Sequence, residues 1–412
     1  MGVTQRRRGP SRRRFVIAAV GAVGFTGASL AMEAASARLL TPRWLALPEP
    51  IAQIFPAADD GALLALSRSG RLWRVDGASG AAGVVGEGLD ATGPVATGSG
   101  RIAARRSDGA LWVRERGRIQ TATDVALAPH AGLLILPFAV VGIALGRDGH
   151  RVVRTEVATN GAWRVADRSN EAVLPDARPV RAALDGEGDG GHVVVLAGPD
   201  DRRYRHGVLG DAIESTRLLY LERHGLTVLR EWRVPAPQVI EDIAPRVVTD
   251  GGRDALLTVQ SGPRGAQLVL VGADRADPAG LAVLARGEPL GAPSRWMAPT
   301  TDGTHWLAVH TPHIGGVLHR YVRDNDRLVG ERIAAGYSNH RIGSRLLDSG
   351  SWLDGRVLLP DQAGSRLALL DLAHGARVVA EVTLPDAVAA TVAWTGGRHA
   401  VLLADGRVGT VA

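Results

Sequence analysis

Turns that contain glycine recur at a nearly constant interval in the first part of the chain. Ser69-Gly70, Asp108-Gly109 and Asp148-Gly149 place their glycines 39 and 40 residues apart. Short aliphatic and β-favouring runs lie between these turns, and no long window shows the apolar period of an amphipathic helix. A repeat of about 40 residues matches one four-stranded blade of a β-propeller. The sequence therefore predicts an all-β fold.

Two of these turns are followed by similar strands. Residues 70–75 read Gly-Arg-Leu-Trp-Arg-Val, and residues 109–114 read Gly-Ala-Leu-Trp-Val-Arg. Because side chains alternate between the two faces of a strand, we expect Leu and Trp to pack between adjacent blades while alternate arginines face water.

Further strand-like runs continue along the chain, and their irregular spacing after residue 160 indicates longer loops. They are Val193–Leu196, Leu218–Leu221, Ala255–Val259, Leu268–Val271, Trp306–Val309, Val317–Tyr321, Val357–Leu359 and Leu367–Leu370. At about 40 to 50 residues a blade, residues 38–412 predict a single β-propeller of seven blades, with eight as the alternative count. Two stacked β-sandwiches are the rival architecture.

The end of the chain, Val392–Val411, again shows a strand, a turn and a strand. We expect it to pair with the strand near Leu63–Leu66, because such pairing closes the ring and removes the exposed edges of an open sheet.

The first 37 residues have the features of a secretory signal peptide. Ser11-Arg12-Arg13-Arg14-Phe15-Val16 resembles the twin-arginine consensus, with Arg12 and Arg13 as its export signal. An apolar run, Phe15–Met32, precedes Ala35-Ser36-Ala37, a cleavage site of the A-x-A type. We expect cleavage after Ala37, the Tat translocase as the export partner, a β-propeller domain at 38–412, and a periplasmic or extracellular location. The alternative is an uncleaved membrane anchor, since the apolar run is just long enough to span a bilayer.

Charge and cysteine content exclude several classes of function. The arginines of the leader account for most of the formal net charge of +6, so the rest of the chain is close to neutral. A near-neutral surface lacks the broad positive field that attracts the phosphate backbone of nucleic acids, so we expect no nucleic-acid partner. The chain has no cysteine, which excludes disulfides, thiolate metal sites and thiol catalysis.

Several polar motifs follow one another between about residues 180 and 370. They are His206-Gly207-Val208-Leu209-Gly210-Asp211-Ala212-Ile213-Glu214, Glu241-Asp242-Ile243-Ala244-Pro245-Arg246, Arg295-Trp296-Met297-Ala298-Pro299, Pro312-His313 and Asn339-His340-Arg341-Ile342-Gly343. The order of these motifs resembles a family of exported proteobacterial β-propeller proteins with FG-GAP or VCBS-type repeats. The resemblance implies a propeller scaffold and no particular reaction.

Repeats of this family normally carry an aspartate-rich calcium loop, from which the sequence departs. The stretches after Pro245 and Pro299 hold too few carboxylates to surround a calcium ion. The best remaining candidate is the run at 185–190, in which Asp185, Glu187 and Asp189 alternate with glycines. Its alternative interpretation is a solvated acidic turn. We therefore expect no cofactor, with calcium at this loop as the one candidate.

Other patterns that carry chemistry are weak. Four histidines, His305, His310, His313 and His319, suggest a metal site by type, but their spacing in extended structure points them in different directions. No nucleophile elbow, zinc-protease helix or phosphate loop is present in the sequence. Propeller enzymes assemble their sites from several blades, so this absence leaves a dispersed active site open.

The polar motifs form the main candidate ligand site. If the inner strand of each blade begins near them, one mouth of the channel would gather Arg246, Arg295, Trp296, His313, His340 and Arg341. Arginines can hold a carboxylate and a tryptophan can stack on a ring, so these residues favour an anionic ligand. The alternative is that they lock blades together through buried ion pairs with Glu214, Glu241 or Asp242.

These observations predict a non-catalytic periplasmic propeller that binds a small anionic ligand or a partner protein at one face of the ring. The alternatives are an enzyme with a dispersed site at the channel mouth and a purely structural envelope protein. An enzyme should show a deep funnel with an acid or base of shifted pKa, whereas a protein-binding module should show a rim with an exposed apolar patch.

Overall fold

The computed structural model describes residues 37–184, 186, 191–274 and 276–412. Its regular elements are strands, apart from two short 3-10 helices, η1 (Gly207–Leu209) and η2 (Leu372–His374). No helix in these ranges has the length and apolar character needed to cross a membrane. Residues 37–412 form one compact unit.

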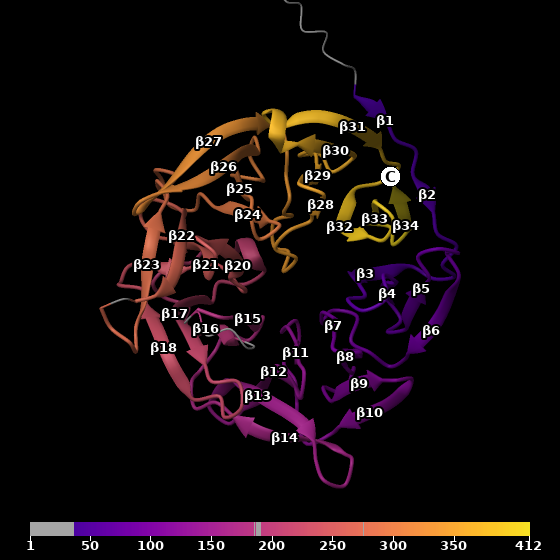
Figure 1. Ribbon diagram of the computed structural model, residues 1–412, viewed down its shortest axis with the longest axis vertical. Coiled ribbons are helices and arrows are strands. Elements are labelled where there is room, and N and C mark those ends of the chain that lie inside the picture. Colours follow the sequence, from indigo (N-terminus) through magenta and orange to yellow (C-terminus); the bar gives the residue numbers. More distant parts are fainter. Residues whose placement is uncertain (1–36, 185, 187–190, 275) are drawn as a thin grey trace, which may run out of the picture. The chain divides into compact units, whose positions relative to one another are not determined.

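The strands of this unit form four-stranded blades around a central opening, with the first strand of each blade innermost (Figure 1). Blade 1 holds β3 (Ile51–Pro56), β4 (Leu63–Ser67), β5 (Leu72–Val75) and β6 (Ala82–Gly86). Blade 2 holds β7 (Ala96–Gly98), β8 (Arg101–Arg105), β9 (Leu111–Glu115) and β10 (Arg118–Ala122). Blade 3 holds β11 (Leu134–Leu136), β12 (Ala139–Gly146), β13 (Gly149–Val157) and β14 (Trp163–Arg168).

The middle blades are joined into one continuous sheet. Blade 4 holds β15 (Val180–Ala182), β16 (His192–Asp200), β17 (Glu214–Leu221) and β18 (Val228–Arg233). Blade 5 holds β20 (Arg246–Asp250), β21 (Arg253–Ser261), β22 (Gln267–Ala273) and β23 (Leu281–Arg286). Blade 6 holds β24 (Met297–Thr301), β25 (Trp306–His310), β26 (Val317–Asp324) and β27 (Arg327–Ala335). The short strand β19 (Val239–Ile240) pairs with both β17 and β21 and so links blades 4 and 5.

The two last blades include strands from the start of the described chain. Blade 7 holds β28 (Ser351–Leu353), β29 (Arg356–Pro360), β30 (Arg366–Asp371) and β31 (Arg377–Thr383), with β1 (Arg38–Leu39) added in parallel to β31. Blade 8 holds β32 (Val388–Trp394), β33 (Arg398–Leu403), β34 (Val408–Val411) and β2 (Arg43–Trp44). The described residues thus form an eight-bladed propeller, the alternative to the seven blades that the sequence analysis favoured. The first blades use only about 40 residues each, and the additional residues of the later blades lie in loops. The chain is therefore long enough for an eighth blade.

The ring closes by a different pairing from the one expected. β2 pairs antiparallel with β34, with Arg43 opposite Thr410 and Trp44 opposite Gly409. Residues 63–66 instead lie in β4, inside blade 1. The expectation was wrong because β2 has only two residues and lies among prolines, so it gives no strand pattern. Closure in this way makes β2 the outer edge of blade 8, whereas β1 extends the outer edge of blade 7.

The repeated turns explain the 40-residue period. In blade 1 the turn at Gly70 has φ +82°, and a Cβ there would lie 2.3 Å from the Leu89 carbonyl oxygen. The Leu89 N–H in turn donates to the Gly70 carbonyl, at 3.0 Å, and the Leu127 N–H makes the same bond to Gly109, at 2.8 Å. Both turns therefore contact the segment that enters the next blade. The positive φ favours glycine at Gly70 and at Gly109, and at Gly70 the close approach excludes a Cβ as well.

The apolar core lies between successive blades, as the Leu-Trp pairs predicted. Leu72 of blade 1 and Trp112 of blade 2 are fully buried in one cluster, together with Leu64 and Leu89. Trp73 packs on the other side of blade 1, against the cluster shared with blade 8. Burial of such side chains between blades supplies the main stabilisation of a propeller, because each blade cannot cover its own apolar faces.

Candidate functional site at the channel mouth

The polar motifs lie on one face of the ring. β20 begins at Arg246 and β24 begins directly after Trp296, so these motifs precede the innermost strands of blades 5 and 6. The turn between the second and third strands of a blade returns to the same face, because the strands alternate in direction. This face, termed the loop face, carries the connections 201–213, 311–316 and 336–350.

The connection 336–350 extends across the mouth of the channel. It joins β27 to β28, yet its Gly343 N–H donates to the Val208 carbonyl of the 201–213 connection, at 2.9 Å. Arg345 forms ion pairs with Asp176 and Asp211, each at 2.8 Å. Arg178 donates to the Arg345 carbonyl at 2.7 Å. Residues from blades 6 and 7 are therefore fixed to residues at the entry of blade 4.

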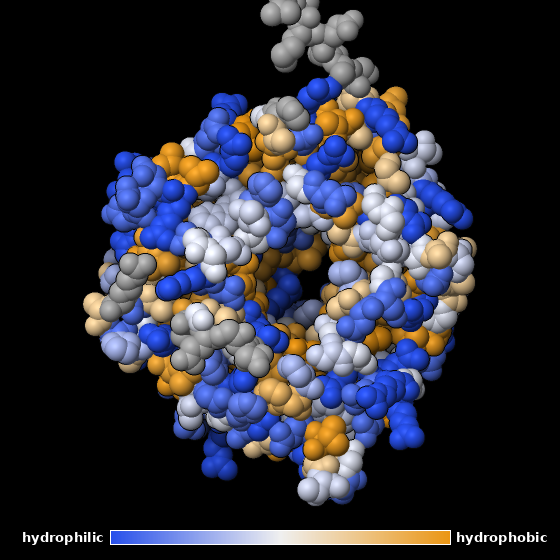
Figure 2. Space-filling model, viewed as in Figure 1, coloured by the Kyte–Doolittle hydropathy of each residue, from blue (hydrophilic) through white to orange (hydrophobic). Residues whose placement is uncertain are grey.

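A cavity of about 590 Å³ lies in the channel beside this connection. Figure 2 shows the central opening, with hydrophilic residues visible in its depth. The basic residues in the cavity lining are Arg178, Arg341, Arg345 and His130, and its apolar residues include Ile54, Phe55, Pro94, Ile342, Leu346 and Leu402. Among the described residues that line it, none is an aspartate or glutamate. A lining of this kind suits an anion that also carries apolar groups.

Arg178 is the most buried cation of this cavity. Its Nε atom is buried and has no hydrogen-bond partner among the described residues. Burial lowers the pKa of Arg178 to about 10, and the nearby charge of Arg246 acts in the same direction, whereas Asp176 opposes it. The guanidinium stays charged at neutral pH and presents an unused N–H group. Such a group is costly to leave unpaired, so an anion that reached it would be favoured.

Trp296, His313 and His340 form a packed aromatic cluster. The Trp296 ring stacks on the His313 ring, with the ring centroids 6.4 Å apart. It also contacts the His340 ring, with the ring centroids 4.7 Å apart. His340 Nε2 lies 2.9 Å from the Ser344 carbonyl oxygen, which can only accept, so this nitrogen carries the proton. His340 Nδ1 therefore accepts from His313 Nε2, at 3.1 Å. Burial lowers the pKa of His340 to about 4, which keeps it neutral at pH 7.

The three predicted arginines have three different environments. Arg246 forms an ion pair with the buried Asp242, as the blade-locking alternative requires, although its Nη2 atom is buried without a partner in the described part of the chain. Arg341 is exposed and lines the channel cavity. Arg295 is exposed on the loop face and does not line the cavity. The six predicted residues therefore divide into an aromatic cluster, a buried ion pair and two exposed cations.

Buried carboxyl groups lie behind the aromatic cluster. Glu241 accepts hydrogen bonds from His206 Nδ1, at 2.6 Å, and from the Ser261 hydroxyl, while its backbone carbonyl accepts from the Trp296 indole, at 3.2 Å. Burial, followed by the charges of Glu241 and Asp211, raises the pKa of Glu214 to about 10. Glu214 is therefore neutral at pH 7. It does not line the channel cavity.

The sequence analysis missed Asp176, Arg178 and Arg345, which hold the crossing connection in place. A usable signal existed, because Asp176 and Arg178 lie just before β15, whereas Asp242 lies before β20 and Arg246 is the first residue of β20. Residues 174–178 read Leu-Pro-Asp-Ala-Arg, an acid followed closely by an arginine at the entry of a blade. His130 gave no signal, because it lies in a turn without a matching motif in other blades.

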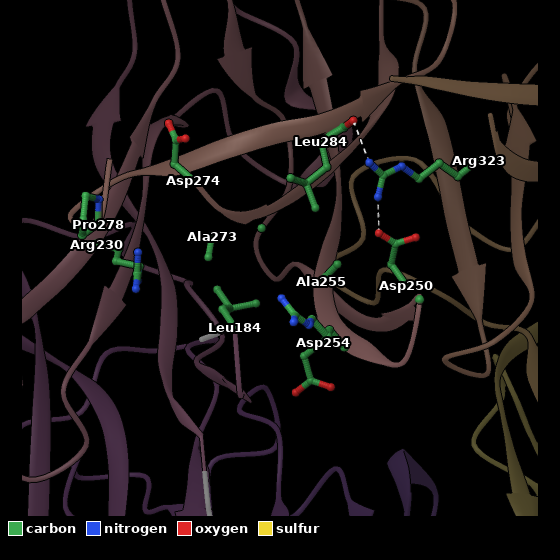
Figure 3. Close-up of a pocket in the computed structure, with 13 residues that line it drawn as sticks. Leu184, Arg230, Asp250, Asp254, Ala255, Ala273, Asp274, Pro278, Leu284 and Arg323 are labelled. Atoms are coloured by element: carbon green, nitrogen blue, oxygen red, sulfur yellow. Dashed lines mark hydrogen bonds and ion pairs between the residues drawn. The ribbon is translucent and has the colours of Figure 1, made fainter. Parts of the chain in front are cut away.

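Another hollow lies on the side of blades 4 and 5 opposite the loop face. This groove, of about 860 Å³, is lined by residues of both blades and of β26, and Figure 3 shows Arg323 reaching Asp250 and the Leu284 carbonyl across it. Leu184 borders it, and the calcium candidates Asp185, Glu187 and Asp189, which follow in sequence, lie outside the described residues. Because this surface is incomplete, we assign no site to it.

The four histidines considered for a metal site have separate partners. His305 contacts Asp302 at 2.9 Å, and His310 stacks on His319 with centroids 3.6 Å apart and contacts the Tyr321 hydroxyl at 2.7 Å. His313 belongs to the cluster with Trp296. In the described ranges no group of three or more histidine or acidic residues is arranged to hold a metal ion.

Comparison with known proteins supports the fold. No family model and no curated protein sequence matches the chain. The structure is similar to that of BamB from Moraxella catarrhalis, with 17% identity, a TM-score of 0.53, and coverage of 90% of this chain and 96% of that one. It is also similar to Sqt1 of Saccharomyces cerevisiae, with 10% identity, a TM-score of 0.57, and coverage of 91% and 98%. At these identities the similarity concerns the propeller fold alone.

Proposed function

We propose that this chain is a non-catalytic periplasmic propeller that binds an anionic ligand in the channel cavity at its loop face. The observation that carries the proposal is the lining of that cavity, which combines Arg178, Arg341 and Arg345 with apolar side chains and holds no carboxylate among its described residues. Arg345 is already paired with two aspartates. The exposed Arg341 and the positive charge of Arg178, whose Nε is buried, therefore supply the attraction for an anion.

Binding is favoured over catalysis because of where the titratable groups lie. Glu214 has the strongly raised pKa expected of a catalytic acid, but it does not line the cavity. His206 and Glu241 also lie outside the lining. Apart from His130, the basic side chains that a ligand in the cavity would meet are guanidinium groups, which stay charged at physiological pH and are poor proton donors and acceptors in catalysis.

Export supports the choice of compartment in this proposal. The motif at 11–16 resembles the twin-arginine consensus, and the chain has no cysteine that oxidation in the periplasm would affect. The resemblance to exported propellers with FG-GAP or VCBS-type repeats belongs to the same proposal.

Citrate is a suitable probe, because it presents several carboxylates to the cavity. Its binding to the purified protein can be measured by calorimetry and by the rise of Tm with citrate concentration. We expect Arg341→Gln to weaken citrate binding about tenfold, the effect of losing one charge-assisted contact. Arg295→Gln is the matched control, because this arginine is exposed on the same face but lies outside the cavity. Equal affinities for both variants and the wild type would overturn the proposal.

A further inference from the structure

Three connections of the loop face each present an exposed isoleucine. Ile213 in 201–213 is 36% exposed, Ile314 in 311–316 is 66% exposed, and Ile342 in 336–350 is 71% exposed. Leu346, in the last of these, is 36% exposed. Single exposed apolar residues are normal on a protein surface, whereas exposed apolar residues held close together mark interaction sites.

These three connections are fixed to one another. The His313–His340 contact, at 3.1 Å, joins 311–316 to 336–350 one residue before Ile314 and two before Ile342. The bond from Gly343 to Val208, at 2.9 Å, joins 336–350 to 201–213. The Arg345–Asp211 pair, at 2.8 Å, acts beside Ile213, whose N–H donates to Asp211 at 2.9 Å. The aliphatic side chains therefore project from a framework that is ordered before any partner binds, which lowers the entropic cost of binding.

Two arginines of the loop face have no carboxylate partner within the described ranges. Arg295 and Arg341 are exposed and have no side-chain hydrogen bond or ion pair in that part of the chain. Asp211, which lies beside Ile213, is already paired with Arg345. A partner that covers the isoleucines therefore meets unpaired guanidinium groups, which carboxylates match in charge and geometry.

We propose that the anionic ligand of the channel cavity is a segment of a partner protein that carries aliphatic and acidic side chains close together. This inference rests on the proposed function. Its aliphatic side chains contact Ile314, Ile342 and Leu346, and a carboxylate enters the cavity towards Arg341. A protein segment fits better than a lipid surface, because Ile342 and Leu346 belong to the lining of a concave cavity of about 590 Å³ as well as to the exposed face. A membrane would leave that cavity unfilled.

Selection of peptides from a random dodecapeptide phage library tests this inference. The library is selected on the purified protein after depletion on the double variant Ile314→Ser, Ile342→Ser. We expect the retained peptides to combine Asp or Glu with Ile, Leu or Val, and to bind the double variant at least about tenfold more weakly in fluorescence anisotropy. Amide replacements of their acids should weaken binding to the wild type but have little effect on binding to Arg341→Gln.

Ile119→Ser is the matched control, because Ile119 is 54% exposed on β10, at the outer edge of blade 2. It should bind the peptides as the wild type does. Failure to retain acidic, aliphatic peptides, or equal binding by the double variant, would overturn the inference. Two other results would also overturn it. One is binding to phosphatidylglycerol vesicles, and not to peptides, that the double variant loses; the other is a dimer, seen in sedimentation velocity, that the double variant does not form. The proposed function would stand in each case if citrate binding still depended on Arg341.

Discussion

Arginines at the channel mouth differ in role because they differ in distance from carboxylates. Arg246 and Arg345 are ion-paired, whereas Arg295 and Arg341 are not. The sequence predicted arginines at the entries of blades, since the motifs precede the inner strands. It did not predict which of them would be paired, because Asp176 and Arg345 are separated by 169 residues and meet only when the ring has closed.

We predict that Arg345→Met destabilises the protein by about 2–4 kcal/mol, because it leaves the nearly buried Asp176 without its cation and frees the crossing connection. Urea unfolding measures this change. Arg327→Met is the control, since the Arg327–Glu288 pair is exposed on both sides and should contribute less than about 1 kcal/mol. Similar losses for the two variants would show that the Arg345 pairs are not what holds this connection.

Glu214 should make stability depend on pH. Its folded-state pKa is raised from 4.5 to about 10, so folding keeps a proton that the unfolded chain releases. Stability from this group is complete below pH 4.5 and is lost as pH rises towards 10. A glutamine at this position has no proton to lose, so the variant escapes this loss of stability. We therefore predict that the free energy of unfolding of Glu214→Gln minus that of the wild type is larger at pH 8 than at pH 5, by at least about 2 kcal/mol. Parallel pH curves for the two proteins in urea unfolding would contradict this assignment.

At the scale of elements, turns were predictable and connections were not. The glycine turns of the first blades recur because each must contact the entry of the next blade, a constraint that also applies to Gly406 at the end of the chain. The connections 201–213 and 336–350 do not recur at a fixed interval. Their length depends on the contacts that they make with each other, such as the bond from Gly343 to Val208 and the Arg345–Asp211 ion pair. The candidate cavity is lined by part of 336–350, and the residues that this connection brings to it could not be read from a repeat.

The turn between β25 and β26 offers a sharp test of this constraint. Gly316 has φ +48°, and a Cβ there would lie 1.8 Å from the Tyr337 carbonyl oxygen, whereas Gly315 has φ +85° and open space around it. Gly316→Ala should therefore destabilise the protein by more than about 2 kcal/mol, and Gly315→Ala by about 1 kcal/mol from backbone strain alone. Thermal and urea unfolding of both variants measure the difference. Equal losses would mean that the turn shifts to accommodate the methyl group.

At the scale of the whole molecule, the propeller was predictable from the early repeat, whereas the blade count and the closing pair were not. The number of residues per blade varies too much after residue 160, so dividing the length of the chain by a typical blade length does not distinguish seven blades from eight. The closing strand β2 has two residues, so its place in blade 8 depends on pairing with Gly409 and Thr410 and not on its own pattern. Because β2 and β34 come from opposite ends of the described chain, blade 8 is complete only when both segments are present.

The closing pair bears on export, because a chain that is exported folded must pair residues 43–44 with 409–410 before transport. The twin-arginine route carries folded proteins, and the leader motif at 11–16 fits that route. We predict that replacing Arg12 and Arg13 with lysine reduces the periplasmic fraction at least about tenfold and leaves folded precursor in the cytoplasm, because lysine keeps the charge but not the arginine geometry that the receptor would read. Replacing Arg7 and Arg8 with lysine is the control, as these arginines lie outside the motif. Fractionation with protease protection distinguishes the outcomes, and full periplasmic recovery of the Arg12, Arg13 variant would show that the chain does not depend on this route.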